Sequence, residues 1–305
     1  MLQGVTIDRQ DVVGKGGEAI VYRARLGSQT IVAREVLMGP RYWNTPLGRK
    51  ITRLVNREAI THSQLRHPNI LPFLGIYRKT PGSPPIVILP YMEGGSLSDL
   101  LSDGPLTEAV EFTQIILGVS RGVLYLHSRN PPIIHGDLHP GNVLLDKFGN
   151  PYLCDFGLSR IRHEVTRTHT ALQEGGRIRF LAPELSSGGM VKFRTSKESD
   201  IFSLAMTFLN IWTGKPPFSH VKNEQKVLAH FLKGQRPPHP ASTITLEATV
   251  TTNFWNLIVN MWAQEPEKRP PIAHALNKLE NMLARCKSQE YCVSSLRTTI
   301  SYDSC

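Results

Sequence analysis

The sequence predicts an α+β fold with two unequal parts, a small β-rich N-terminal part and a larger, mostly helical C-terminal part. Residues 5 to 37 alternate apolar and polar side chains around glycines, a pattern typical of strands joined by hairpins. Residues 47 to 65 repeat apolar side chains at nearly helical spacing, and helical patterns dominate from residue 106 onward. A chain of 305 residues with 40% hydrophobic residues can form one two-lobed domain or two small domains.

Each expected element follows from the order of apolar residues and chain breakers. Residues 39 to 46 are rich in breakers and form a loop before the first helix, which we expect over 47 to 65. Residues 80 to 85 contain three prolines and one glycine and predict a turn between strands. A second helix is expected over 106 to 127, and residues 286 to 305, rich in Ser and Thr, form a flexible tail.

Composition argues against several functional classes. The net charge is +10, but the basic residues are scattered, with neither zinc-finger spacing nor an aromatic-rich RNA-recognition signature, so we expect no nucleic-acid partner. No apolar run reaches the roughly 18 residues of a membrane span, and the first residues lack a secretory pattern. The four cysteines show no metal-ligand spacing, and Cys154 is expected to be a small buried side chain. We therefore expect an intracellular, cytoplasmic protein.

The most informative segment is His135-Gly-Asp-Leu-His-Pro-Gly-Asn142, which is followed by Asp155-Phe156-Gly157. It supplies an Asp, an Asn five positions later and a second Asp before a Phe-Gly turn. Phosphoryl transfer to a hydroxyl needs such a set, because one carboxylate aligns the hydroxyl while an amide and a second carboxylate hold Mg²⁺ on the nucleotide phosphates. The spacing therefore points to phosphoryl-transfer chemistry.

Seven further segments occur in a fixed order along the chain. They are Gly14–Tyr22, Glu58, His67–Ile70, Ile88–Leu97, Ala182–Glu184, Ser199–Ser203 and Glu267–Pro270. Together with the two central motifs they make residues 8 to 285 resemble the eukaryotic protein kinases of the tyrosine-kinase-like group. The resemblance implies a bilobal protein kinase fold. Residues 1 to 7 would form an N-terminal extension, about 8 to 90 the N-lobe with its C-helix, 90 to 95 the hinge, and about 96 to 285 the mostly helical C-lobe.

The same resemblance implies a site for ATP and Mg²⁺ between the lobes. Asp137 would be the catalytic base, Asn142 and Asp155 the metal ligands, and His139 would lie near the transferring phosphate. The remaining implied nucleotide contacts are Gly14 and Gly16 of the Gly-rich loop, Ala33 and Glu35 on the third strand, Glu58 on the C-helix, the hinge backbone of Pro90 and Met92, Ser96 near ribose, and the apolar walls Val21 and Leu144.

The third strand departs from the family pattern, because no alignment supplies the Lys that grips the phosphates. If Ala33 faces the adenine, period-two alternation places Glu35 at the Lys position. If the strand is shifted by one residue, Arg34 takes that position instead. Arg binds phosphate bidentately and is not equivalent to Lys.

Three more positions also differ from the family. Gly136 replaces an Arg that reads a phosphorylated activation loop, and His139 replaces a Lys that touches the transferring phosphate. Arg177 stands where a Thr supports the catalytic Asp, and there it could pair with Asp137 and block it.

Two functions follow from the resemblance. The first is an ATP-dependent protein kinase in intracellular signalling, which transfers the γ-phosphoryl group of ATP to Ser or Thr hydroxyls of a protein substrate. Ser/Thr is favoured because His139-Pro140-Gly141-Asn142 resembles the Ser/Thr kinase pattern. The alternative is a pseudokinase that binds nucleotide or a regulatory protein partner without transfer. The missing Lys and Arg177 favour the second, whereas the intact Asp137, Asn142 and Asp155 favour the first.

Overall fold

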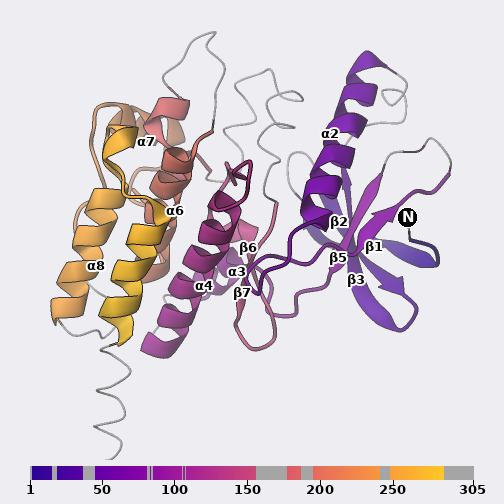
Figure 1. The fold of residues 1–305 in the computed structure, drawn as a ribbon, viewed down its shortest axis with the longest axis horizontal. Coiled ribbons are helices and arrows are strands. Elements are labelled where there is room, and N and C mark those ends of the chain that lie inside the picture. Colours follow the sequence, from indigo (N-terminus) through magenta and orange to yellow (C-terminus); the bar gives the residue numbers. More distant parts are fainter. Residues whose placement is uncertain are drawn as a thin grey trace, which may run out of the picture.

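The computed structural model consists of a β-rich N-terminal lobe and a helical C-terminal lobe, as the sequence predicted (Figure 1). The residues that it describes are 2–15, 19–36, 45–80, 83, 85–104, 106, 108–155, 177–186, 195–240 and 248–284. The expected tail over 286 to 305 therefore lies outside the described residues.

The N-terminal lobe is built on one antiparallel sheet with the strand order β1-β2-β3-β5-β4. The strands are β1 (Val5–Lys15), β2 (Ala19–Leu26), β3 (Gln29–Val36), β4 (Gly75–Tyr77) and β5 (Ile86–Pro90). The first three strands are neighbours in sequence and in the sheet, which confirms the hairpins expected from period-two alternation. Because β1 begins at Val5, the sheet includes residues 5 to 7, which the sequence assigned to an N-terminal extension.

The two faces of β3 point into two different apolar clusters, because successive side chains of a strand alternate. Ile31 and Ala33 pack on the outer face with Val5, Ala24 and residues of β5. Val32 and Val36 pack on the inner face, in a cluster that also contains residues of the helix α2 and of the C-terminal lobe. The inner face is therefore the one that looks toward the second lobe.

Helix α2 (Pro46–Ser63) lies against this inner face and matches the helix predicted over 47 to 65. It begins at Thr45, whose side chain accepts a hydrogen bond from the backbone N–H of Gly48. Its buried stripe, Ile51, Val55 and Ala59, recurs every four residues. The helix thus packs one apolar face against the sheet.

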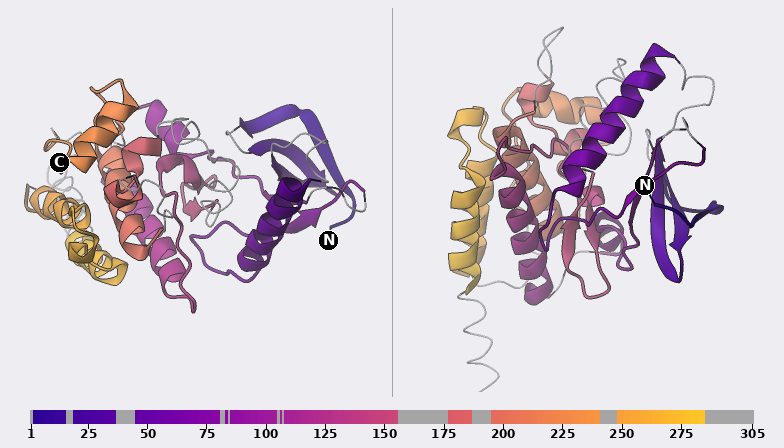
Figure 2. Two further views of the ribbon diagram at one scale, coloured as in Figure 1. Left: turned by 90° about the horizontal axis from the view of Figure 1, so that it is seen from above. Right: turned by 45° about the vertical axis from the view of Figure 1, so that its right-hand side comes forward.

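The C-terminal lobe packs its helices around α4 and α6 (Figure 2). Its helices are α3 (Leu97–Ser102), α4 (Ala109–His127), α6 (Lys197–Thr213), α7 (Glu224–Leu232), α8 (Ala248–Met261) and residues 272–284. Shorter elements are the strands β6 (Val143–Leu145) and β7 (Pro151–Leu153) and the 3₁₀ turns η1 (Pro140–Asn142), η3 (Arg177–Phe180), η4 (Pro183–Leu185) and η5 (Pro266–Lys268). Phe112, Phe254 and Trp212 meet edge to face in its core.

One helix in the described part of the chain, α4, is long and apolar enough to cross a membrane by length and composition alone. However, 61% of its most apolar window is buried inside the protein. Packing in the core of the C-terminal lobe therefore accounts for its composition.

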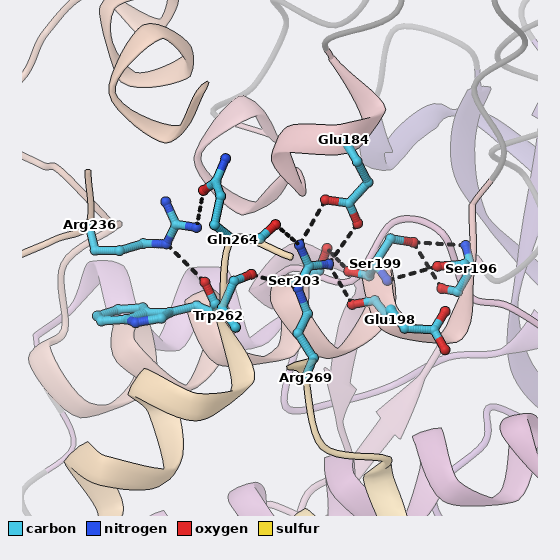
Figure 3. Close-up of polar contacts among 10 residues, drawn as sticks. Glu184, Ser196, Glu198, Ser199, Ser203, Arg236, Trp262, Gln264 and Arg269 are labelled. Atoms are coloured by element: carbon cyan, nitrogen blue, oxygen red, sulfur yellow. Dashed lines mark hydrogen bonds and ion pairs between the residues drawn. The ribbon is translucent and has the colours of Figure 1, made fainter. Parts of the chain in front are cut away.

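An arginine network ties the Ala-Pro-Glu segment to the end of the domain (Figure 3). Arg269 donates to both carboxylate oxygens of Glu184, at 2.6 and 2.8 Å, and to the carbonyl of Glu198 at 2.9 Å. The guanidinium groups of Arg236 and Arg269 both lie over the ring of Phe202, and the central carbon of each is 5.1 Å from the ring centroid. Burial, together with the positive charge of Arg269, lowers the pKa of Arg236 to about 10.

We predict that Glu184→Gln destabilises the fold, because it leaves the fully buried Arg269 side chain without a carboxylate partner. The expected loss in the free energy of unfolding is about 1–3 kcal/mol, since Glu184 itself is partly exposed. Glu280→Gln is the matched control, because Glu280 and Arg121 form an ion pair of 2.8 Å, close to the 2.6 Å between Glu184 and Arg269, in which both side chains are nearly half exposed. We expect that control to lose less than about 1 kcal/mol in urea unfolding. Equal losses in the two variants would contradict the role of the buried pair.

Candidate active site

One buried carboxylate holds the segment that carries the candidate catalytic residues. Asp200 on α6 accepts hydrogen bonds from the backbone N–H groups of His135 and Gly136 and from Nε2 of His127, all at 2.8 Å. Gly136 has φ of 76°, a left-handed conformation in which a side chain is strained. Gly136, which departs from the family pattern, is therefore compatible with the left-handed backbone conformation at this turn.

The three residues predicted to be catalytic come together immediately after this anchor. Nδ2 of Asn142 donates to both the backbone oxygen and Oδ2 of Asp137, each at 2.8 Å. Nε2 of His139 lies 3.4 Å from the same Oδ2. Nδ1 of His139 accepts the N–H of Gly141 at 3.1 Å, so the proton of a neutral ring resides on Nε2 and faces the carboxylate.

Asp155 is joined to this loop through the backbone. The N–H of Cys154 donates to the carbonyl of Asn142 at 3.0 Å, and the preceding strand β7 pairs with β6. Cys154 is buried, as the sequence predicted. Asp155 has φ of 59°, which is uncommon outside glycine and occurs preferentially at functional sites.

Arg34 occupies the position that faces the site on the third strand. It pairs with Val21 across the β2–β3 ladder and is almost fully buried. Its Nη1 lies 3.4 Å from Oε1 of Glu58 on α2, and its Nε lies 3.5 Å from Oδ1 of Asp155. One guanidinium therefore connects the sheet, the helix and the C-terminal lobe.

The assignment of Ala33 and Glu35 to the nucleotide site is corrected by this register. Ala33 is completely buried in the outer cluster of the sheet. Glu35 lies on the same outer side, with Oε2 2.9 Å from Nη1 of Arg9. The register is shifted by one residue from the one that puts Ala33 toward adenine, so that Val32 lies on the inner face of the sheet with Arg34. The signal that identifies Val32 is its period-two relation to Arg34, the basic residue of this strand.

The two apolar walls predicted for adenine and the predicted hinge residue Met92 come from three parts of the chain. Val21 from the sheet, Leu144 from β6 and Met92 from the segment after β5 all pack on the inner-face cluster of Val32. Pro90 ends β5. The N–H of Gly94 donates to the carbonyl of Leu145, and the N–H of Leu145 donates to the carbonyl of Gly95, so the segment between the lobes is fastened to β6.

Three other predicted contacts have different outcomes. Ser96 caps the N-terminus of α3, and its hydroxyl donates to Oδ2 of Asp99 at 2.7 Å. Gly14 pairs with Val21 in the β1–β2 hairpin, where a Cβ would make ordinary contacts. Gly16 lies outside the described residues, as do Phe156 and Gly157.

The Asp137 carboxylate contacts the amide of Asn142 and the ring of His139. Arg177 begins the 3₁₀ turn η3 and is half-buried. The hypothesis that Arg177 pairs with Asp137 and blocks it stays a prediction.

The donor atoms of Asn142 and Asp155 fit a magnesium ion bound with phosphates. Because Nδ2 of Asn142 donates to Asp137, Oδ1 remains as its acceptor, and Asp155 adds a carboxylate. No group of three or more His, Cys, Asp or Glu side chains that could hold a metal occurs among the described residues. An amide and one carboxylate suit Mg²⁺, which keeps several waters and uses phosphate oxygens rather than a full protein cage.

Comparison with known proteins identifies the family. The family model described as the protein kinase domain matches residues 7–279. The chain belongs to the protein kinase family. Members of this family generally use ATP and Mg²⁺, and the family predicted from the ordered motifs is confirmed.

Several curated relatives are serine/threonine-protein kinases by name. The chain is 32% identical over 240 residues to Receptor-interacting serine/threonine-protein kinase 2 of Bos taurus, an alignment that covers 75% of this chain and 43% of the relative. It is 28% identical over 283 residues to Serine/threonine-protein kinase TNNI3K of Homo sapiens, which covers 92% and 32%. For Probable serine/threonine-protein kinase PBL21 of Arabidopsis thaliana the identity is 30%, with 92% and 74% covered. The chain thus spans less than half the length of the first two.

We predict that Arg34, and not Glu35, is required for nucleotide binding. Arg34→Ala removes the cation beside Glu58 and Asp155, and loss of one charge-assisted contact of about 1.5–3 kcal/mol weakens ATP binding roughly 10- to 150-fold. Glu35→Gln changes a residue on the outer face and should leave binding unchanged. The shift in melting temperature on adding ATP with Mg²⁺ measures both. A shift lost in Glu35→Gln and kept in Arg34→Ala would contradict the register.

We also predict that the buried His135 makes the fold acid-sensitive. Burial lowers the pKa of His135, and its Nδ1 accepts the N–H of Asp137 at 3.3 Å, so the folded protein holds the ring neutral. The unfolded chain takes up this proton below about pH 6.5, and stability therefore falls as the pH drops through that value.

Urea unfolding at about pH 7.5 and about pH 5.5 tests this sensitivity. His135→Asn keeps an acceptor without titrating, and it should reduce the fall in unfolding free energy. His274→Asn, at an exposed position, is the control and should leave the fall unchanged. If His135→Asn loses as much stability on acidification as the unaltered protein, His135 is not the group responsible.

Proposed function

We propose that this protein kinase domain transfers the γ-phosphoryl group of ATP to Ser or Thr hydroxyls of a protein substrate. The observation that carries the proposal is the assembly of Asp137, Asn142 and Asp155 at one place, with Arg34 paired to Glu58 beside them. Phosphoryl transfer depends mainly on positioning and on neutralising phosphate charge. These are the functions that this set of side chains can supply.

Arg34 supplies the cation for the nucleotide phosphates. Its planar guanidinium has five N–H donors, and the contacts to Glu58 and Asp155 at 3.4 and 3.5 Å are long enough to be exchanged for phosphate oxygens. Glu58 holds the guanidinium in the inner face of the sheet. When bound through Asn142 and Asp155, Mg²⁺ would neutralise further phosphate charge.

Asp137 aligns the substrate hydroxyl and accepts its proton. The amide of Asn142 and the ring of His139 both approach Oδ2, which fixes the orientation of the carboxylate. His139 offers an Nε2–H donor where many protein kinases carry a Lys, so it can hydrogen-bond the transferring phosphate from the side of Asp137.

The choice of Ser and Thr as acceptors rests on two supports. The segment His139-Pro140-Gly141-Asn142 resembles the pattern of Ser/Thr kinases, and the relatives at about 30% identity carry serine/threonine-protein kinase names. A protein substrate follows from the same family membership.

A second candidate function is that of a pseudokinase, which binds nucleotide or a protein partner without transfer. The observation that favours it is the ion pair between Arg34 and Asp155. A guanidinium on this carboxylate competes with a metal ion for the same oxygens, because both are cations that need the ionised side chain.

We predict that Asp137→Asn lowers phosphoryl transfer by about 10²- to 10⁴-fold and leaves the ATP-induced thermal shift intact. Asp155→Asn should lose both transfer and the dependence of the shift on Mg²⁺, because Asp155 is a proposed metal ligand. The assay follows ³²P incorporation into a generic Ser/Thr protein substrate and into the chain itself. Asp137→Asn, purified in parallel, measures any contaminating kinase.

The same experiment separates the two functions. Transfer that is equal in the unaltered chain and in Asp137→Asn, together with a normal ATP-induced shift, would establish the pseudokinase. Absence of both transfer and any shift would reject nucleotide binding and with it the proposed kinase.

A further inference from the structure

The outward face of α2 carries a row of positive charge. Arg49, Arg53 and Arg57 are spaced four residues apart, and Lys50 lies beside them, so all four fall on one face of the helix. All four are exposed, as is Ile60, which lies on the same face one turn further on with 61% of its surface exposed. At a rise of about 1.5 Å per residue the three arginines span about 12 Å of the helix axis.

The stability of the helix does not explain Arg53 and Arg57. The first turn of α2 contains no acidic residue, although the positive end of the helix dipole favours acids there. Like charges four residues apart repel each other. The side chains of Arg53 and Arg57 have no hydrogen-bond or ion-pair partner within the part of the chain that the structure describes. Arg53 and Arg57 therefore repel each other without a compensating contact among the described residues.

The only acidic residue of α2 faces the opposite way. Glu58 is turned inward to Arg34, and its side chain is mostly buried. The inner stripe of Ile51, Val55 and Ala59 is also buried against the sheet. The helix is therefore divided into an inner face, which belongs to the nucleotide site, and an outer face with cations and one apolar side chain.

We propose that the outer face of α2 binds an acidic helical segment of a partner protein. Carboxylates spaced four residues apart on such a segment repeat at about 6 Å, which matches the spacing of the three arginines. An apolar side chain at the end of the segment would cover Ile60. The occupant is thus identified by its charge, its periodicity and one apolar contact.

Other classes of anionic partner fit this face less well. The apolar face of α2 is buried, so the helix cannot insert into a lipid surface as an interfacial amphipathic helix does. The residues of α2 include no Phe, Tyr or Trp on which bases could stack. The match in spacing and the exposed Ile60 favour a folded protein segment.

The probe is a fluorescein-labelled helical peptide with Glu at every fourth position and one Leu on the same face at its C-terminal end. A second peptide replaces each Glu with Gln, and a third has the same composition in scrambled order. Fluorescence anisotropy with the full chain at physiological salt measures their affinities. We expect the first peptide to bind at least about tenfold more tightly than the scrambled one, because only the first matches the spacing.

The variant Arg53→Glu with Arg57→Glu should weaken binding of the first peptide by at least about tenfold. The control, Arg25→Glu with Lys79→Glu, makes the same change in net charge at exposed positions outside α2 and should weaken it less than about threefold. Circular dichroism confirms that both variants fold. If the charge-reversed variant does not fold, Arg53→Gln with Arg57→Gln replaces it with the same expected direction.

Three outcomes would overturn the proposal. Equal losses in the two charge-reversed variants would mean attraction by net charge alone, and so would equal binding of the scrambled peptide. Binding of phosphatidylserine vesicles or of duplex DNA that depends on Arg53 and Arg57, without binding of the first peptide, would assign the face to a lipid or a nucleic acid.

Discussion

The buried carboxylate of Asp200 is the interaction on which the rest of the site depends. It receives three hydrogen bonds of 2.8 Å, two from the backbone of the loop before Asp137 and one from His127 at the end of α4. An ionised group that is almost fully buried is stable only when its oxygens are satisfied in this way. Two core helices and the catalytic segment are thereby held in one arrangement. Gly136 allows the turn that brings both N–H groups to the same carboxylate.

Further contacts, mostly of the backbone, then connect this loop to the other residues of the candidate site. Asn142 holds Asp137 with its side chain and accepts from Cys154 with its carbonyl, which places Asp155 next in the sequence. The strand before Asp155 also pairs with the segment after α2, since the N–H of Leu71 donates to the carbonyl of Leu153 at 2.9 Å. Arg34 closes the connection by reaching both Glu58 and Asp155. The N-terminal lobe is thus connected to the C-terminal lobe by groups of the candidate nucleotide site.

Periodicity was sufficient to predict α2, α4 and the hairpins of the sheet, and the spacing of the motifs was sufficient to bring Asp137, Asn142 and His139 together. Periodicity could not determine which residues of β3 face the inner side of the sheet. This strand is buried on both faces, so Val32 and Ala33 are both small apolar residues and the pattern has two equivalent phases. Residues far away in the sequence decide between the two phases, because Arg9 pairs with Glu35 on the outer face of the sheet and Glu58 pairs with Arg34 on the inner face. Likewise, the sequence around Asp200 gives no indication that its side chain binds the loop before Asp137.

The charge of the candidate site determines what nucleotide binding at Arg34 would require. Within the contacts of Arg34, one positive side chain faces two carboxylates, so this group carries a net negative charge before any phosphate arrives. A polyphosphate would increase that charge, and in a largely buried site the repulsion is screened much less than in water. A metal ion on Asn142 and Asp155 would reverse the imbalance and would release the guanidinium from Asp155 toward the phosphates. A lysine would carry the same single charge, so neither residue could neutralise Glu58, Asp155 and a polyphosphate together, and a metal ion at Asp155 would have to supply the remaining positive charge.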